Sequence, residues 1–127
     1  DFTDHINLYK EIDIALDTFP FTGGVTTTDA LWMGVPVLAK AGKDTFISHQ
    51  GESILKNAGL SDWIASNPED YVDKAINFAS DLPCLESFRK SARTLLANSP
   101  LFDSKRFALD FGDTLRAMWQ VYIDRNS

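Results

Sequence analysis

The feature that most constrains the fold is an alternation of short apolar segments with longer segments of helical periodicity. Turn-forming and polar residues bound each apolar segment, and the three segments cover residues 12–18, 35–39 and 62–65. A helical pattern follows each of them, at 26–34, at 46–58 and from Pro68 onward. Strands that alternate with helices form a parallel sheet. The sequence therefore predicts an α/β fold with a partial Rossmann-like sheet, since complete sheets of this kind have about five or six strands.

The C-terminal third has a helical pattern without strands. Pro83 opens one helix, and Asp103 starts a last helix after a break at 98–100. The last helix carries an aromatic stripe about 100° wide, formed by Phe107, Phe111, Trp119 and Tyr122. Such a stripe predicts that these side chains pack in the core. The alternative is that part of the stripe is exposed and drives dimerisation. We expect a single domain over residues 1–127 with a helical tail at about 83–125.

Composition excludes several classes of function. Lys and Arg number 12 against 18 Asp and Glu, and the net charge of −6 argues against a nucleic-acid partner and a basic membrane patch. The single cysteine, Cys84, excludes a disulfide within the chain and a cysteine-rich zinc site. Charges, glycines and prolines interrupt the stretch at 14–39, so no membrane span is predicted. These features favour a cytoplasmic location.

The segment at 17–29 carries most of the chemical signal. A strand ends, Gly23 and Gly24 turn the chain, and a helix begins among threonines. Helix starts have free amides that attract phosphate, and glycine permits close approach of the backbone. Asp29 lies one turn into the helix, where its carboxylate suits ribose hydroxyls. From these residues alone, a glycine-rich turn with threonine caps fits equally well. Asp17, at the strand end, is interpreted as a cap for this turn rather than as a catalytic acid.

Two separated motifs give the chain a family resemblance. The first motif consists of three segments: Leu16-Asp17-Thr18, Gly23-Gly24-Val25-Thr26-Thr27 and Ala30-Leu31-Trp32-Met33-Gly34-Val35-Pro36-Val37. Together they resemble the nucleotide-sugar motif of protein O-linked N-acetylglucosamine transferases and their bacterial relatives, family 41 of glycosyltransferases. Ser99-Pro100-Leu101-Phe102-Asp103 and the helix that follows are similar to the family's C-terminal segment. The resemblance covers nearly the whole chain in order.

The resemblance implies a place for this chain in a larger enzyme. The family has the GT-B fold, with two Rossmann-like lobes, and residues 1–127 correspond to the second half of the C-terminal, nucleotide-sugar-binding lobe. The chain starts at Asp1, with no initiator methionine and no leader. We therefore expect a fragment of a longer protein, with an upstream lobe and a helical-repeat region as its partners.

The resemblance also implies the residues of a UDP site. Asp29 would bind the ribose, His5 would lie near the nucleotide, and the diphosphate would be held by Gly24, Val25, Thr26 and Thr27. Val25 departs from the threonine that many bacterial members have there, and His49 stands where many relatives have arginine. The catalytic residues are unknown and are expected upstream, where the family has a lysine. No metal is expected, since the chain lacks an Asp-x-Asp motif.

The predicted activity of the parent protein is sugar transfer without a cofactor. A UDP-sugar, with N-acetylglucosamine as the expected sugar, would be the donor, and Ser or Thr hydroxyls of a protein would be the acceptors. The fragment alone would be inactive. Two alternatives remain open at this point: glucose transfer to Asn, as in related adhesin glycosyltransferases, and a non-catalytic nucleotide-binding module.

Overall fold

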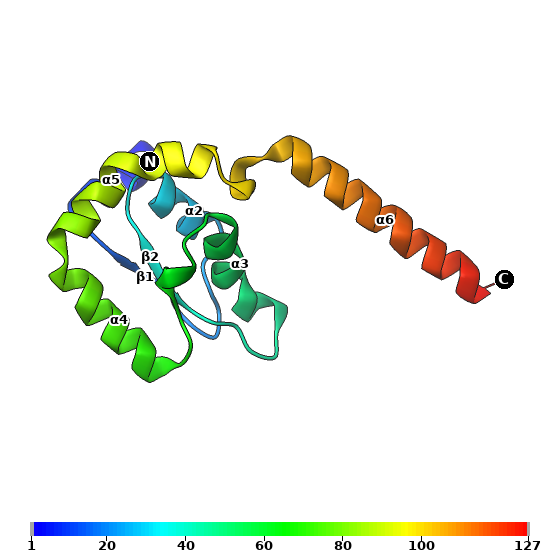
Figure 1. The fold of residues 1–127 in the computed structure, drawn as a ribbon, viewed down its shortest axis with the longest axis horizontal. Coiled ribbons are helices and arrows are strands. Elements are labelled where there is room, and N and C mark those ends of the chain that lie inside the picture. The colour runs from blue at the N-terminus through cyan, green and yellow to red at the C-terminus, as the bar shows by residue number, and fades with distance from the viewer. Residues whose placement is uncertain (1, 127) are drawn as a thin grey trace.

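The computed structural model describes residues 2–126, which form a small three-stranded sheet, helices around it and one projecting helix (Figure 1). The elements run in chain order as α1 (Phe2–Leu8), η1 (Tyr9–Glu11), β1 (Ala15–Leu16), α2 (Val25–Trp32), β2 (Val37–Lys40), η2 (Phe46–His49), α3 (Gln50–Asn57), η3 (Ser61–Trp63), β3 (Ile64–Ala65), α4 (Pro68–Ser80), α5 (Leu82–Ala97), η4 (Pro100–Phe102) and α6 (Ser104–Asn126).

The sheet is parallel, with the order β1-β2-β3. Ala15 is in register with Val37, and Ala39 is in register with Ile64. Helices α2 and α3 lie together beside the sheet, α4 packs on β2 and β3 from the other side, and α5 contacts both α2 and α4 (Figure 1). The predicted α/β fold with a parallel sheet is confirmed, and the three predicted strands are present.

Local sequence explains where the later helices begin. The Asn67 side chain accepts a hydrogen bond from the Asp70 amide at 2.8 Å, directly before the first-turn proline of α4. Asp81 caps α5 in the same way through the Cys84 amide at 3.0 Å. Asp103 accepts from the Arg106 amide at 2.9 Å at the start of α6. These side chains satisfy amides that the helices themselves leave without partners.

The core lies between β2 and the surrounding helices. Leu31 of α2, Leu38 of β2, Leu55 of α3 and Leu96 of α5 have no accessible surface. Gly34 ends the turn after α2 with φ +81°, and a Cβ there would lie 3.1 Å from the Arg89 carbonyl oxygen. The close approach of α2 and α5 therefore requires glycine at this position.

Several element boundaries differ from those predicted: β2 is Val37–Lys40 where 35–39 was expected, and α2 is Val25–Trp32 where 26–34 was expected. β1 covers only Ala15–Leu16 of the segment expected at 12–18, since a strand with one neighbour is paired only where that neighbour reaches it. Residues 61–63 form η3, and the strand expected at 62–65 is Ile64–Ala65. The segment at 46–58 divides into η2 and α3. The helix α1 was not predicted, because its residues show no apolar periodicity.

The prediction that the aromatic stripe of the last helix packs in the core is wrong. Phe107 is 67% exposed and Trp119 is 62% exposed, and the other apolar side chains of α6 from 109 to 123 are also exposed. The helix points away from the body of the domain, so nothing in the described chain covers this face (Figure 1). The alternative, that the stripe is exposed, holds.

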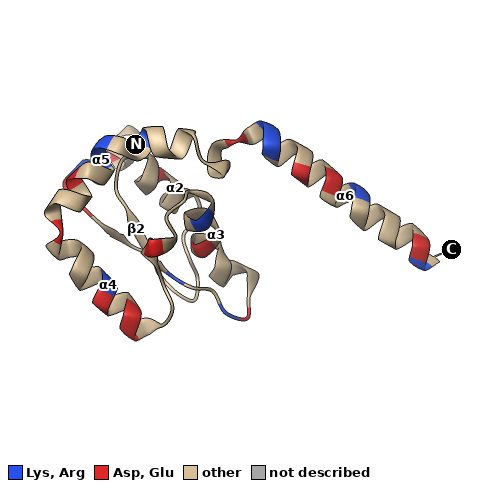
Figure 2. Cartoon of the chain, in the orientation of Figure 1, with Lys and Arg blue, Asp and Glu red and all other residues tan. Residues whose placement is uncertain are grey.

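Charged residues of both signs are spread over the surface. Basic and acidic residues alternate along α6, and α4 is mainly acidic (Figure 2). Residues 2–126 contain no helix that is both long and apolar enough to cross a bilayer.

Glu52 of α3 anchors the loop that follows β2. One carboxylate oxygen accepts from the Gly42 amide at 2.8 Å and lies 3.2 Å from His49 Nδ1, and the other pairs with Lys56 Nζ at 2.5 Å. The hydrogen bond from Lys56, with that from the Gly42 amide, lowers the pKa of Glu52 to about 2. The folded protein therefore favours the charged carboxylate.

The core analysis gives a matched pair of leucine substitutions. We expect Leu38→Ala to lower the free energy of unfolding by about 2–5 kcal/mol, because it removes a fully buried side chain and leaves a cavity. Leu109→Ala should change it by less than about 0.5 kcal/mol, since Leu109 is 70% exposed on α6. Urea denaturation measures both. Equal effects of the two substitutions would contradict the assignment of the core.

The Glu52 network makes a pH-dependent contribution to stability. Because the folded pKa is below the unfolded value of 4.5, the contribution is complete above pH 4.5 and is lost as the pH falls toward 2. We expect Glu52→Gln to lower the free energy of unfolding by about 1 kcal/mol at pH 7. Denaturation experiments at a series of pH values from 7 downward should show that the difference in unfolding free energy between the wild type and Glu52→Gln shrinks below pH 4.5. The exposed Glu11→Gln variant is the control, and a constant difference at all pH values would refute the assignment.

Candidate functional site

The candidate site lies where the carboxyl ends of the three strands meet. The Asp17 amide donates to the Leu38 carbonyl at 2.9 Å, and the Ala41 amide donates to the Ala65 carbonyl at 2.7 Å. The three strands therefore end at the same edge of the sheet, and the loop from 17 to 24 leads from this edge to the start of α2. Ligands of open α/β sheets bind at such an edge.

The start of α2 has free amide donors. Gly24 is the N-cap residue and provides no side-chain hydrogen bond, and the first bond of the helix runs from the Thr28 amide to the Gly24 carbonyl at 3.1 Å. The amides of Val25, Thr26 and Thr27 therefore precede the helical ladder without a side-chain cap. Together with the Gly24 amide they make four consecutive donors at a helix start, an arrangement that suits a phosphate group.

Two threonine hydroxyls crowd around Gly23. A Cβ at Gly23 would lie 2.5 Å from Thr27 Oγ1 and 2.9 Å from Thr26 Oγ1. A side chain at position 23 would therefore force both hydroxyls to move. Thr28 belongs to a different environment, because its hydroxyl donates to the Val25 carbonyl at 2.7 Å. Val25 itself is 75% exposed and offers its backbone amide but no hydroxyl.

The loop between β1 and α2 is held by buried polar contacts. Asp17 Oδ1 accepts from the Gly23 amide at 2.7 Å, which confirms Asp17 as a cap of the turn. The Thr22 hydroxyl donates to the Ile47 carbonyl at 2.9 Å and accepts from the Gly51 amide at 3.0 Å. Burial raises the pKa of Asp17, and the opposing effect of hydrogen bonds from amides is smaller. The turn is therefore fixed both to its own strand and to α3.

His5 lies on the exposed side of α1 and is connected to α2 through Tyr9. The rings of His5 and Tyr9 meet edge to face, with centroids 5.4 Å apart. The Tyr9 hydroxyl donates to the Thr26 carbonyl at 3.3 Å. Burial, together with the charge of Asp29, raises the pKa of Tyr9, so these side chains are electrostatically coupled. Tyr9 therefore contacts His5 and Thr26 and lies within the electrostatic influence of Asp29.

Sequence reasoning gave no role to Tyr9 or Gln50. Tyr9 is buried, and a Cβ at Gly24 would lie 3.8 Å from Gln50 Oε1, so the Gln50 side chain reaches toward the helix start. No periodicity marks either residue, because both contacts join segments that are distant in the sequence. His49 is 52% exposed and contacts Glu52, so it is a polar residue of the surface.

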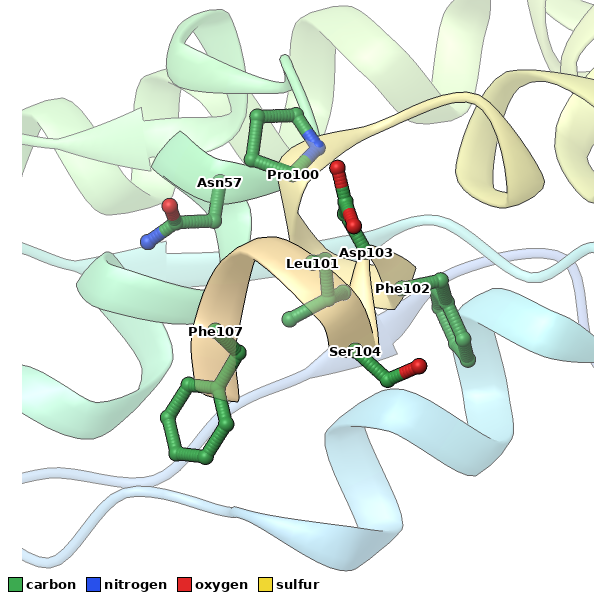
Figure 3. A pocket seen from close by; sticks show the side chains of 7 residues that line it. All are labelled: Asn57, Pro100, Leu101, Phe102, Asp103, Ser104 and Phe107. Carbon is green, nitrogen blue, oxygen red and sulfur yellow. The ribbon is translucent and has the colours of Figure 1, made fainter. Parts of the chain in front are cut away.

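A surface cavity lies away from the candidate site, at the turn between α5 and α6 (Figure 3). Its volume is about 420 Å³, and it is lined by Asn57, Pro100, Leu101, Phe102, Asp103, Ser104 and Phe107. No residue predicted for the nucleotide site is among them. A smaller cavity of about 180 Å³ adjoins the start of α2 and includes Tyr9, Asp17, Thr26 and Thr27.

The chain is similar in sequence to plant glycosyltransferases. The SPINDLY protein of Petunia hybrida, named a probable UDP-N-acetylglucosamine–peptide N-acetylglucosaminyltransferase, is 42% identical over 121 residues, which are 95% of this chain and 13% of that protein. The SEC protein of Arabidopsis thaliana, named in the same way, is 28% identical over 120 residues, which are 94% of this chain and 12% of that protein. The chain thus spans about one eighth of the length of these relatives.

A solved structure and a family profile agree with these similarities. A mutant of the O-GlcNAc transferase of Thermobaculum terrenum matches with a TM-score of 0.85 and 34% identity, covering 98% of this chain and 24% of that one. This match confirms the predicted fold as part of the C-terminal lobe of a GT-B enzyme. The profile of glycosyl transferase family 41 matches residues 3–111. The predicted resemblance is confirmed, and the chain belongs to glycosyl transferase family 41.

Proposed function

We propose that this chain forms part of the donor site of a protein glycosyltransferase, with UDP-N-acetylglucosamine as the donor and Ser or Thr hydroxyls as acceptors. The uncapped start of α2 carries the proposal, because Gly24, Val25, Thr26 and Thr27 present their amides at the carboxyl edge of the sheet. The names of the SPINDLY and SEC relatives support the donor and the peptide acceptor.

The chemistry assigned to these residues is stabilisation of the leaving group. Transfer of the sugar leaves a nucleoside diphosphate, whose terminal phosphate gains negative charge as the glycosidic bond breaks. Fixed amides and the positive end of a helix dipole stabilise such charge without reorganisation. Asp29 would accept hydrogen bonds from the ribose hydroxyls, and His5 would contact the nucleotide. No metal ion is needed in this scheme.

The rest of the activity is assigned to the longer protein. We infer that the catalytic residues and the acceptor-binding surface lie in an upstream lobe and a helical-repeat region, and that the fragment alone is inactive. We also infer a cytoplasmic location and a bacterial-type parent protein; both plant proteins and a bacterial protein resemble the chain. The alternative of a non-catalytic nucleotide-binding module uses the same site and differs only in the upstream residues.

The proposed contact between Asp29 and the ribose predicts a loss of affinity only for ligands that contain ribose. We expect Asp29→Ala to weaken UDP binding about tenfold or more, because hydrogen bonds to a charged group contribute about 1.5–3 kcal/mol. Binding of inorganic pyrophosphate, which has no ribose, should be unchanged. Amide chemical shifts during titration of the ¹⁵N-labelled chain give both affinities and identify the residues that respond.

Asp73→Ala is the matched control, because Asp73 is an exposed helical aspartate on α4. It should leave both affinities unchanged. A folded Asp29→Ala variant with the UDP affinity of the wild type would contradict the ribose contact. A wild-type chain that does not respond to millimolar UDP would contradict the proposed donor site of this chain as a whole.

The crowded position of Gly23 predicts that a substitution there lowers the affinity for pyrophosphate as well as for UDP. We expect Gly23→Ala to weaken UDP and pyrophosphate binding together, by about tenfold or more, because the added methyl group must displace the hydroxyls of Thr26 and Thr27. Gly112→Ala is the control, since a Cβ at Gly112 meets only the end of Arg116 at 3.8 Å. The same titrations measure both variants, and full pyrophosphate affinity in Gly23→Ala would refute the assignment.

A further inference from the structure

Asp17 is fixed in space through its backbone. Its amide belongs to the ladder with β2, where it donates to the Leu38 carbonyl at 2.9 Å. Its carbonyl accepts from the Tyr71 hydroxyl of α4 at 2.8 Å. These bonds tie Asp17 to the central strand and to the helix on the other side of the sheet. The Cα–Cβ bond of Asp17 therefore has a defined direction, which the loop beyond it cannot easily change.

The two carboxyl oxygens of Asp17 have different surroundings. Oδ1 accepts from the Gly23 amide at 2.7 Å across the loop. Oδ2 is buried and has no hydrogen-bond partner within residues 2–126. A Cβ at Gly51 would lie 2.3 Å from Oδ2, so the carboxyl group packs against the backbone of α3. Contact with α3 on one side leaves the group little freedom to turn away from Gly23.

The Gly23 amide is the last donor before the free amides of α2. Because Asp17 occupies it, the donors that remain for a ligand begin at Gly24 and end at Thr27. Thr22, next to Gly23, is held separately by Ile47 and Gly51 of the η2–α3 segment. Two anchors on adjacent residues fix the peptide plane that leads into the helix. A phosphate site made of amides depends on the direction of those planes.

We propose that Asp17 is a positioning residue for the diphosphate site: its carboxyl group holds the Gly23 amide and so directs the amides of Gly24–Thr27 toward the ligand. This inference rests on the proposed function. It assigns to Asp17 no contact with the nucleotide and no part in proton transfer. Its effect should therefore depend on a hydrogen-bond acceptor at position 17 and not on a negative charge.

The first test uses the wild-type chain without nucleotide. A through-hydrogen-bond NMR coupling from the Gly23 amide nitrogen to the side-chain carboxyl carbon of Asp17 is expected. The Gly23 amide should also exchange with deuterium more slowly than the amides of Gly24–Thr27. Absence of the coupling together with exchange as fast as that of the free amides would overturn the proposal, whatever the chain binds.

The second test uses substitutions at position 17 and two ligands, UDP and uridine. Asp17→Ala should weaken UDP binding about tenfold or more and leave uridine binding unchanged, since uridine has no phosphate. Asp17→Asn retains an acceptor oxygen and should restore UDP affinity to within about threefold of the wild type. Asp13→Ala is the control, because the Asp13 side chain is 78% exposed and lies before the same strand.

The outcomes separate this inference from the proposed function. If the wild type binds neither UDP nor pyrophosphate, the donor site fails and this proposal fails with it. If the wild type binds UDP and a folded Asp17→Ala variant binds it equally well, only the role of Asp17 is refuted. Equal losses of UDP and uridine would refute it too, since they indicate a general structural effect. If Asp17→Ala does not fold, Asp17→Ser takes its place, because the serine side chain is too short to reach the Gly23 amide. Full UDP affinity in Asp17→Ser would then contradict the positioning role of Asp17.

Discussion

The burial of β2 between two parallel neighbours is the constraint on which the rest of the structure depends. Val37, Leu38 and Ala39 have almost no accessible surface, so helices must cover both faces of the strand. Because the three strands run in the same direction, their carboxyl ends meet at one edge. The loop after β1 and the start of α2 are brought to that edge by the topology alone. The location of the candidate site is therefore a consequence of how the core is buried.

The helices differ in how their first turns are satisfied: α2 and α3 have no side-chain cap, and α3 continues directly from η2. Asn67, Asp81 and Asp103 cap α4, α5 and α6 with side-chain oxygens. Gly24 leaves α2 without such a cap. Glycine at the N-cap costs a helix only a few tenths of a kcal/mol, on the order of a fifth of the loss with alanine, so α2 gives up little stability by having no capping side chain. A side chain at the N-cap would compete with a phosphate for the same amides. The uncapped start is thus the property that the proposed ligand site requires.

Local signals in the sequence predict the starts of α4, α5 and α6 to within one residue, and tertiary contacts account for much of the rest. The Asn67-Pro68 pair acts through its own first turn, and it places the start of α4 correctly. Tyr9 could not be found in this way, because its contact with Thr26 spans 17 positions and depends on how α1 folds back. The stripe on α6 shows the limit most clearly. Periodicity identifies an apolar face, but it does not say whether the described chain contains the surface that covers it.

A site built on amides also explains how an acidic chain can bind an acidic ligand. The net charge of −6 argues against partners that need an extended positive field, such as a nucleic acid. A diphosphate is held by a few atoms at short range, where peptide dipoles act without any basic side chain. Lys40, at the end of β2, is directed elsewhere, since its Nζ donates to the Ala41 carbonyl and lies 5.2 Å from the ring of Phe19. Net charge therefore limits which macromolecules this domain can bind, whereas local backbone geometry determines which small ligands it can bind.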